Sequence, residues 1–340
     1  MQDDAVIRVQ SLDFHWPTRD PFLFCAYHND HYPPGNSDMG PQASLQGRDI
    51  GMDFTLKDGW RMYHGDRVPG FPAHPHRGFE TVTVVSKGMV DHADSMGAAG
   101  RYGGGDVQWM TAGRGVQHSE MFPLLDDQQG NDLELFQIWL NLPRIGKMVD
   151  PHFTMFWREA IPVVTQQDSA GRTIRVDIIA GSLGGSEPLS PPPDSWAADA
   201  DNHVSIWIIR LAAGAVWTLP AAVNGLNRTL YFHRGADMQV AGVGVAPMHA
   251  VELLSDRDVL LANGAATGYL LLLQGRPINE PVAHHGPFVM NSRAELQQAF
   301  LDYQQTQFGG WSWPRHDQTH GRGRGRFARY ADGREEVRES

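Results

Sequence analysis

The chain has 340 residues, which is enough for two domains with separate cores, since a domain takes roughly 150 residues on average. Its 37 glycines, 22 prolines and 20% charged residues are typical of a compact protein with many turns and favour an all-β fold. The formal net charge of −11 argues against a surface that neutralises phosphates, so no direct nucleic-acid binding is expected.

The single cysteine, Cys25, rules out an intrachain disulfide and a cysteine-rich zinc site, and it suits a reducing cytoplasm. The amino-terminal stretch MQDDAVIRVQSLDF has neither the basic start nor the apolar run of a secretion signal, and no segment has the length of a membrane helix. We therefore expect a cytoplasmic protein without membrane association.

Short strand patterns separated by glycine and proline fill the first part of the chain, and they predict an amino-terminal β domain over residues 1–150. The stretch 94–106 is rich in the glycine and aspartate that tight hairpin corners need. Residues 34–69 are polar with weak strand patterns and predict a long functional flap. The clearest strand patterns cover residues 79–85, 106–110 and 134–142.

A second β-rich region repeats this succession of strands. When RTLYFHRG is aligned with TVTVVSKG, Gly235 falls on Gly88, and Asp258 falls on Asp106 at a slightly different offset. This pattern indicates a weak internal duplication. The strand patterns of the second region cover residues 204–211, 228–235, 250–255, 258–263 and 268–275.

The connection between the two regions contains residues 183–201, which are rich in proline, serine and glycine and are typical of an extended surface linker. We assign residues 151–202 to this connector together with the first strands of the second domain. The second β-barrel, with its helix, then covers residues 203–310.

One helix is expected over residues 292–308, because Ser292 and Glu295 form a capping box and apolar residues recur behind them at helical spacing. The tail, residues 311–340, alternates glycine with arginine. Residues 315–340 contain seven arginines against five acidic residues, so the local positive excess is small. A solvated or domain-clasping tail is therefore favoured over an RNA-binding one.

Two histidine-containing motifs stand at strand positions. In FPAHPHRGFETVTVV, residues two apart share a face of a strand, so His74, His76 and Glu80 should line one wall. Further along, GRGVQHSEM repeats this spacing with His118 and Glu120. If the two strands adjoin in a small barrel, three imidazoles and a carboxylate can hold one divalent metal with positions left open. Such a set suits iron(II), with manganese, nickel, copper, cobalt or zinc as alternatives.

Each motif alone has a plainer interpretation, because a His-x-His pair is most often structural. Two polar pairs inside apolar strands are costly to bury unless something binds them, which favours a metal. Glu80 is open between a fifth ligand, an acceptor that orients a histidine, a general base and a structural barrel residue.

Four further residues are candidates for substrate binding. Phe79, Trp109 and Met110 could form an aromatic slot, with core packing as the alternative. Arg114 lies in a glycine-flanked loop and could meet an anionic substrate, with simple exposure to solvent as the alternative.

Five stretches of the chain form a common pattern: HPHRGFETVTVV, DHADSMG, GGGDVQWMTAGRGVQHSEM, LFQIWLNLP and GPFVMNSRAELQQAFLDYQQTQFGG. Taken together, they resemble the pirin family, a branch of the two-barrel cupins. The resemblance covers about residues 20–310 and implies two tandem cupin β-barrels with a carboxy-terminal helix. It also implies one metal, usually iron, in the first barrel, held by His74, His76, His118 and Glu120.

The sequence also departs from the family pattern. Residues 34–69 are longer than the corresponding family segment, and the tail after Trp313 extends past the usual family end. In the second barrel, Ala221, Val223 and Asn227 stand where the first-barrel pattern has two histidines and a glutamate. We therefore expect no metal in the second barrel.

The resemblance implies two alternative functions. The first is a quercetin 2,3-dioxygenase-like enzyme that uses O₂ to open a flavonol or related small aromatic substrate, with Glu120 or Glu80 taking the substrate hydroxyl proton. The second is a non-catalytic regulator that responds to iron or redox state and binds a protein partner. A cupin sugar isomerase is less favoured, because no cluster of lysine and arginine for a sugar phosphate accompanies the motifs.

Overall fold

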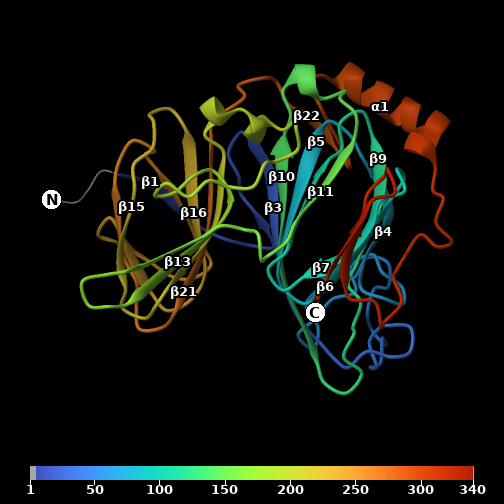
Figure 1. Cartoon of the computed structure of the whole chain (residues 1–340), viewed down its shortest axis with the longest axis horizontal. Helices are drawn as coiled ribbons and strands as arrows, with labels where there is room; N and C mark the ends of the chain where they lie inside the picture. Colours follow the sequence, from blue (N-terminus) through green and yellow to red (C-terminus); the bar gives the residue numbers. More distant parts are fainter. Residues whose placement is uncertain (1–4, 340) are drawn as a thin grey trace. The chain divides into compact units, whose positions relative to one another are not determined.

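The structure is a computed structural model that describes residues 5–339, and it divides into two compact units (Figure 1). One unit, here called the histidine barrel, contains residues 26–158 and 280–339. The other, here called the apolar barrel, contains residues 5–25 and 159–279. Each unit is built mainly from strands, so the predicted all-β fold with two tandem cupin barrels and a carboxy-terminal helix is confirmed.

Two sheets form the histidine barrel. One has the strand order β11-β8-β5-β10-β3, and the other has the order β25-β24-β7-β6-β9-β4. In Figure 1, β5, β10 and β3 lie side by side. The strands are β3 (Phe22–Tyr32), β4 (Gly70–His76), β5 (Phe79–Lys87), β6 (Met89–Asp94), β7 (Ala99–Gly103), β8 (Val107–Thr111), β9 (Val116–Met121), β10 (Asn131–Asn141), β11 (His152–Phe156), β24 (Arg326–Arg329) and β25 (Glu335–Arg338).

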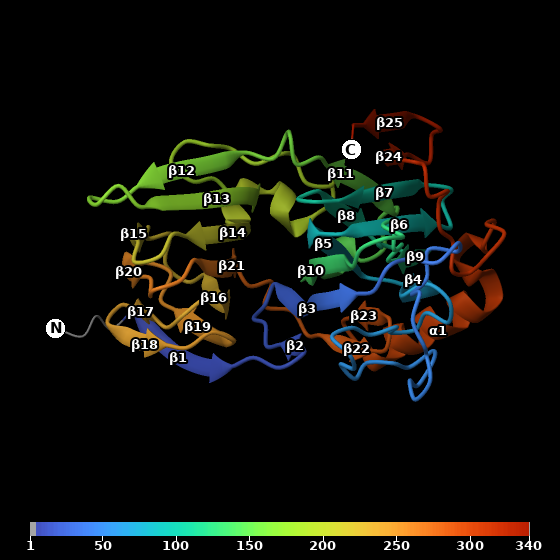
Figure 2. The same cartoon turned by 90° about the horizontal axis from the view of Figure 1, so that it is seen from below.

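The apolar barrel has a sheet of order β1-β19-β16-β21-β14-β13-β12 and a second of order β15-β20-β17-β18. The succession β12, β13, β14 can be followed in Figure 2. Its strands are β1 (Val6–Ser11), β12 (Val163–Gln167), β13 (Thr173–Ala180), β14 (Ser205–Leu211), β15 (Val216–Leu219), β16 (Asn227–Arg234), β17 (Met238–Val240), β18 (Val243–Val245), β19 (His249–Leu253), β20 (Val259–Ala262) and β21 (Gly268–Gly275). The short strands β2 (His15–Trp16), β22 (Ala283–His285) and β23 (Phe288–Met290) complete the set.

The two barrels share one topology, which supports the predicted duplication. Strand β5 lies between β8 and β10, as β16 lies between β19 and β21, and the order β4-β9-β6-β7 matches β15-β20-β17-β18. Strand β20 is therefore the counterpart of β9, and the alignment of Asp258 with Asp106, which precedes β8, was wrong by one strand. The starts of β5 and β9 are residues 79 and 116, whereas the starts of their counterparts β16 and β20 are residues 227 and 259. The segment between them is shorter in the apolar barrel, so an alignment with a nearly constant offset pairs the wrong strands.

This counterpart of the histidine-bearing strands is apolar. On β15 and β20, the buried side chains are Trp217, Leu219, Val259 and Leu261, which all belong to one hydrophobic core. These side chains carry no atom that binds a divalent metal well. Where the histidine barrel carries imidazoles, the apolar barrel is instead stabilised by burial of hydrocarbon.

The division of the chain differs from the expected boundaries at both ends. Strand β1 pairs with β19, so the first residues belong to the apolar barrel and not to the histidine barrel. Residues 280–339, with the helix and the tail, belong to the histidine barrel. Both assignments, that of the first residues and that of residues 280–339, depend on contacts between residues far apart in the chain, which local sequence patterns do not encode.

The predicted helix is present as α1, Arg293–Thr306. The Ser292 hydroxyl accepts a hydrogen bond from the Glu295 N–H at 3.2 Å, and the Glu295 carboxylate accepts one from the Asn291 N–H at 2.9 Å. The buried face of α1 packs on Phe288 and on its neighbours in the same cluster. In the described residues, no helix is long and apolar enough to cross a membrane.

The tail extends the sheet of the histidine barrel. Strand β24 pairs with β7, where Phe327 lies opposite Arg101, and Figure 2 shows β24 and β25 beyond β7. Two buried ion pairs hold this region, with Arg101 Nε 2.6 Å from Asp91 and Arg326 2.7 Å from Asp106. The tail is thus an integral part of this barrel, where a solvated or domain-clasping segment was expected.

Replacing Arg101 with methionine should lower the free energy of unfolding by about 3–5 kcal/mol, because Asp91 is then left buried without its cation. Urea unfolding followed by tryptophan fluorescence measures this change. Arg334→Met is the matched control, since Arg334 and Glu336 form a largely exposed pair that contributes about 1 kcal/mol or less. Equal destabilisation by the two variants would contradict this ranking.

Candidate metal centre

The strands that carry the two histidine motifs are neighbours. Strands β4 and β9 pair antiparallel, with His74 opposite His118, Phe71 opposite Glu120 and His76 opposite Val116. The register shifts between Phe71 and His74, which is a bulge in β4. Because directly opposed residues share a face, Phe71, His74 and His76 all lie on the face of the sheet that carries His118 and Glu120.

The three imidazoles converge. One ring nitrogen from each of His74, His76 and His118 lies within 4.8 Å of the others, and the ring centroids are 4.5–4.9 Å apart. His76 and His118 are buried, and His74 is the least buried of the three. This is the arrangement in which three nitrogens can hold one metal ion.

Hydrogen bonds fix which nitrogen of two of the rings faces the centre. His74 Nδ1 lies 2.9 Å from the Pro72 carbonyl and His76 Nδ1 lies 3.4 Å from that of Pro287, and a carbonyl can only accept. Each Nδ1 therefore carries the proton and leaves the Nε2 lone pair free. Both ring nitrogens of His118 are buried without a hydrogen-bond partner in the described part of the chain. Such an orphaned imidazole is costly unless a ligand binds it, so the residues present fit a metal.

Burial also keeps these rings neutral. Desolvation lowers the pKa of His74 to about 4 and lowers the pKa values of His76 and His118 well below the usual value. At neutral pH all three imidazoles therefore have a free lone pair, and protons do not compete with a cation for it.

Glu120 lies beside the three rings, with Oε2 3.8 Å from His118 Nε2. Gln137 Nε2 donates to Glu120 Oε2 at 2.9 Å. The Thr83 hydroxyl lies 3.0 Å from Glu120 Oε1 and 2.6 Å from Gln137 Oε1, and its one proton cannot serve both. A closed ring of three hydrogen bonds results if Thr83 donates to Gln137 and a protonated Glu120 donates to Thr83. Burial raises the pKa of Glu120 to about 7, which agrees with this proton count.

This raised pKa predicts a pH dependence of metal affinity. Without metal, Glu120 is protonated below about pH 7, so a cation that uses the carboxylate must displace a proton as the pH falls. Apparent affinity should be constant above pH 7 and should fall up to about tenfold per pH unit between pH 7 and 5. Competitive chelator titration measures it, and Glu120→Gln should remove the slope. The same slope in both proteins would exclude Glu120 as the group that loses the proton.

Glu80 does not join the three imidazoles. The chain leaves β4 and enters β5 of the opposite sheet at Gly78, which has φ +86° and where a Cβ would lie 2.0 Å from the Val289 carbonyl oxygen. Because of this turn, β4 and β5 are not one strand, and the shared face expected for His74, His76 and Glu80 is interrupted. On β5, Phe79 and Thr83 point to the site, so Glu80 lies on the other face, where it accepts a hydrogen bond from Thr111 at 2.7 Å.

The four candidate substrate residues lie in different places: two on the inner face of the sheet, one on the outer face and one at the surface. Phe79 packs against His76, with ring centroids 5.0 Å apart. Met110 lies opposite Thr81 on the inner face, whereas Trp109 lies opposite Val82 on the outer face and packs near Phe156. Arg114 forms an exposed ion pair with Asp150 at 2.9 Å.

Several residues at the site were not expected from the sequence. Phe71 and Trp139 are half-buried, and their ring centroids lie 6.3 Å from that of His74 and 5.3 Å from that of His76. Tyr63, from the predicted flap, stacks on Phe71 at 5.3 Å. A sequence signal existed for Trp139, since it alternates with Gln137 in the strand LFQIWLN. None existed for Phe71, because the bulge in β4 brings it to the inner face.

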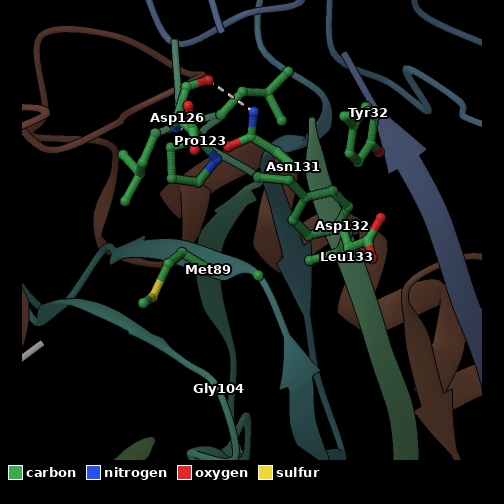
Figure 3. Close-up of a pocket in the computed structure, with 12 residues that line it drawn as sticks. Tyr32, Met89, Gly104, Pro123, Asp126, Asn131, Asp132 and Leu133 are labelled. Atoms are coloured by element: carbon green, nitrogen blue, oxygen red, sulfur yellow. Dashed lines mark hydrogen bonds between the residues drawn. The ribbon is translucent and has the colours of Figure 1, made fainter. Parts of the chain in front are cut away.

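A separate cavity of about 310 Å³ opens at the far end of β5 and β10 (Figure 3). Its lining includes Tyr32, Met89, Leu124 and Leu133, with Asp132 beside them. The lining reaches Gly88, whereas Phe79 at the start of β5 lies on His76, and the nine residue steps from Phe79 to Gly88 span roughly 30 Å of extended strand. None of the predicted site residues lines this cavity, so it is distinct from the metal centre.

Comparison with known proteins agrees with this picture. The Pirin family model matches residues 10–140, and the model of the Pirin C-terminal cupin domain matches residues 206–309. The chain is 38% identical over 243 residues to a pirin-like protein of Caulobacter vibrioides, covering 72% of this chain and 82% of that one. It is 37% identical over 240 residues to a Pseudomonas aeruginosa protein named "Putative quercetin 2,3-dioxygenase", covering 70% and 79%.

Among solved structures, a quercetin 2,3-dioxygenase from Acinetobacter baumannii is similar to this chain, with a TM-score of 0.69 and 26% identity, covering 90% of this chain and 98% of that one. The matched family models include both histidine motifs and most of the second barrel. The chain therefore belongs to the pirin family of the cupin superfamily.

Proposed function

We propose that the histidine barrel is a metal-dependent dioxygenase that acts on a flavonol such as quercetin, or on a related aromatic with adjacent oxygen substituents. The observation that carries the proposal is the convergence of three neutral imidazoles beside a carboxylate of raised pKa. Relatives named for quercetin dioxygenase activity support the choice of substrate class.

Iron(II) is the metal we propose, held by His74, His76 and His118 with Glu120 as the fourth ligand. Three imidazole nitrogens and one carboxylate are a donor set that suits iron(II) and leaves room for substrate and O₂. When bound, the metal supplies the electronic coupling that lets triplet O₂ react with a closed-shell aromatic.

The protein side chains would do the remaining work. Phe71 and Trp139 are both half-buried, and they flank His74 and His76 from two different strands. They offer apolar faces to a planar ring beside the imidazoles. Trp139 is itself held in place by Phe79, with centroids 4.3 Å apart.

Glu120 is the group suited to take the substrate hydroxyl proton. In the metal-free protein its pKa is about 7, so its buried surroundings favour the protonated form, as a group that accepts a substrate proton requires. Thr83 and Gln137 hold its two oxygens, so the carboxylate is oriented before substrate arrives. Deep burial of Glu120 excludes bulk water from the proton transfer.

Replacing Phe71 or Trp139 with alanine should weaken quercetin binding about tenfold, which corresponds to about 1.4 kcal/mol of lost ring contact. Anaerobic titration of the iron-loaded protein, followed by the absorption of quercetin, measures the dissociation constant. Trp196→Ala is the control and should bind like the unsubstituted protein, because Trp196 lies in the apolar barrel, where its indole donates to the Arg276 carbonyl. Unchanged binding in both site variants would exclude these residues as the walls of the substrate site.

A further inference from the structure

We propose that the carboxy-terminal tail, residues 311–339, is the outer layer of the metal centre and that Trp313 is a positioning residue for His118. This inference rests on the proposed metal-binding function. It assigns a role to a segment that lies outside both matched family models.

In a strand, a ligand that points inward has chain neighbours whose side chains point outward, so a segment that covers the outer face of the sheet touches the side chains next to the ligands. The tail runs along the free edge of β4, where Ala73, which precedes His74, donates its backbone N–H to the His316 carbonyl at 2.8 Å. Gln117, which precedes His118, donates from Nε2 to the Gln307 carbonyl at 2.6 Å and so ties β9 to the end of α1, just before the tail.

The third strand of the set, β6, is held in the same manner. In the pairing of β6 with β9, Asp94 lies opposite His118 and His92 lies opposite Glu120. The Trp313 indole N–H donates to the Asp94 carbonyl at 2.7 Å. His320 Nε2 lies 2.9 Å from the His92 carbonyl and therefore donates to it.

A buried arginine anchors the tail. The Arg101 guanidinium, which pairs with Asp91, also donates to the tail carbonyls of His320 at 2.8 Å, Gly321 at 3.0 Å and Arg324 at 2.7 Å. This fork of hydrogen bonds fixes the tail against β7 one strand away from the contacts to β6. The tail is therefore fixed firmly enough to transmit position to the carbonyls that it binds.

These contacts converge on the ligands. The tail holds β4 beside one ligand and β6 opposite two others, and the strand between them, β9, carries His118 and Glu120. Strand β9 is hydrogen-bonded to β6, so a small displacement of β6 that carries β9 with it changes the distance from His118 to the two imidazoles on β4. Partners outside the ligand set often change metal affinity 10–100-fold when removed, through the orientation of the ligands.

The test compares two tryptophans of the tail in the full-length protein loaded with cobalt(II). Trp313→Phe keeps an aromatic side chain but removes the indole N–H that donates to the Asp94 carbonyl. Trp311→Phe is the matched control, because the Trp311 indole donates to the Arg315 carbonyl within the tail itself. We expect Trp313→Phe to release cobalt to a chelator about tenfold faster and to alter the visible d–d spectrum, and Trp311→Phe to change neither.

A second pair covers the case in which Trp313→Phe does not fold. His320→Leu removes the donor to the His92 carbonyl, whereas His320→Gln can restore an N–H at a similar place. Cobalt release should therefore be faster in His320→Leu and should return to the unsubstituted rate in His320→Gln. Release at the unsubstituted rate with an unchanged spectrum in Trp313→Phe, or in His320→Leu where the former does not fold, would overturn the tail's role. If the unsubstituted protein takes up no cobalt, the proposed metal centre itself fails, and this inference falls with it.

Discussion

Replacing His76 or His118 with alanine should abolish stoichiometric metal binding, with at least a hundredfold loss of affinity, roughly 3 kcal/mol or more. Each variant removes one of three convergent nitrogens, and among the described residues no fourth imidazole belongs to this cluster. Metal content after loading and desalting, measured by atomic emission, gives the result directly. Both variants should remain folded, because each removes a ring that has few polar partners in the metal-free protein.

The control for this prediction is His31→Ala. His31 is also a histidine of the histidine barrel, but its side chain is 61% exposed and pairs with Asp132. It does not belong to the cluster of three imidazoles. It should retain one metal per chain. Full metal content in both His76→Ala and His118→Ala would remove the proposed site.

Replacing Glu120 with glutamine should leave the metal bound and lower substrate-dependent oxygen uptake by about 10²–10⁴-fold. Glutamine keeps the size of the side chain and its hydrogen-bonding ability toward Thr83 and Gln137, but it cannot take a proton from substrate. Steady-state oxygen uptake by the iron-loaded variant, with metal content measured on the same sample, separates loss of chemistry from loss of metal.

Glu80→Gln is the matched control for this experiment. The substitution is chemically identical, but Glu80 lies on the outer face of β5 and binds Thr111. Its oxygen uptake should stay within about twofold of the unsubstituted protein, since Glu80 faces away from the three imidazoles and the amide oxygen of glutamine can still accept the Thr111 hydrogen bond. A large loss in Glu80→Gln with little loss in Glu120→Gln would reverse the assignment of the base.

The part of the site that the sequence predicts is the part that depends on local periodicity. His118 and Glu120 lie two apart on one uninterrupted strand, and the alternation of side chains in that strand places both inward. The same rule failed for Glu80, because the turn at Gly78 carries the chain from one sheet to the other. Alternation holds only within a strand, and the sequence did not reveal where β4 ended.

Contacts between distant segments were outside the reach of sequence patterns. Phe71 reaches the inner face through a bulge in β4 that no pattern in the sequence marks. Trp313 reaches β6 through a side-chain hydrogen bond, and β1 pairs with β19, and no local pattern specifies either contact. The helix, in contrast, was predictable, because its capping box and its apolar spacing are both local.

Oxygen consumption by the anaerobically reconstituted iron(II) protein on addition of quercetin, measured beside His76→Ala, decides whether the histidine barrel is a dioxygenase. We expect rapid uptake that requires quercetin, bound iron and His76 together. No uptake from a sample with one iron per chain, across quercetin and a panel of catechols, would contradict dioxygenase chemistry. That result would favour a regulator that binds a protein partner through the same barrel.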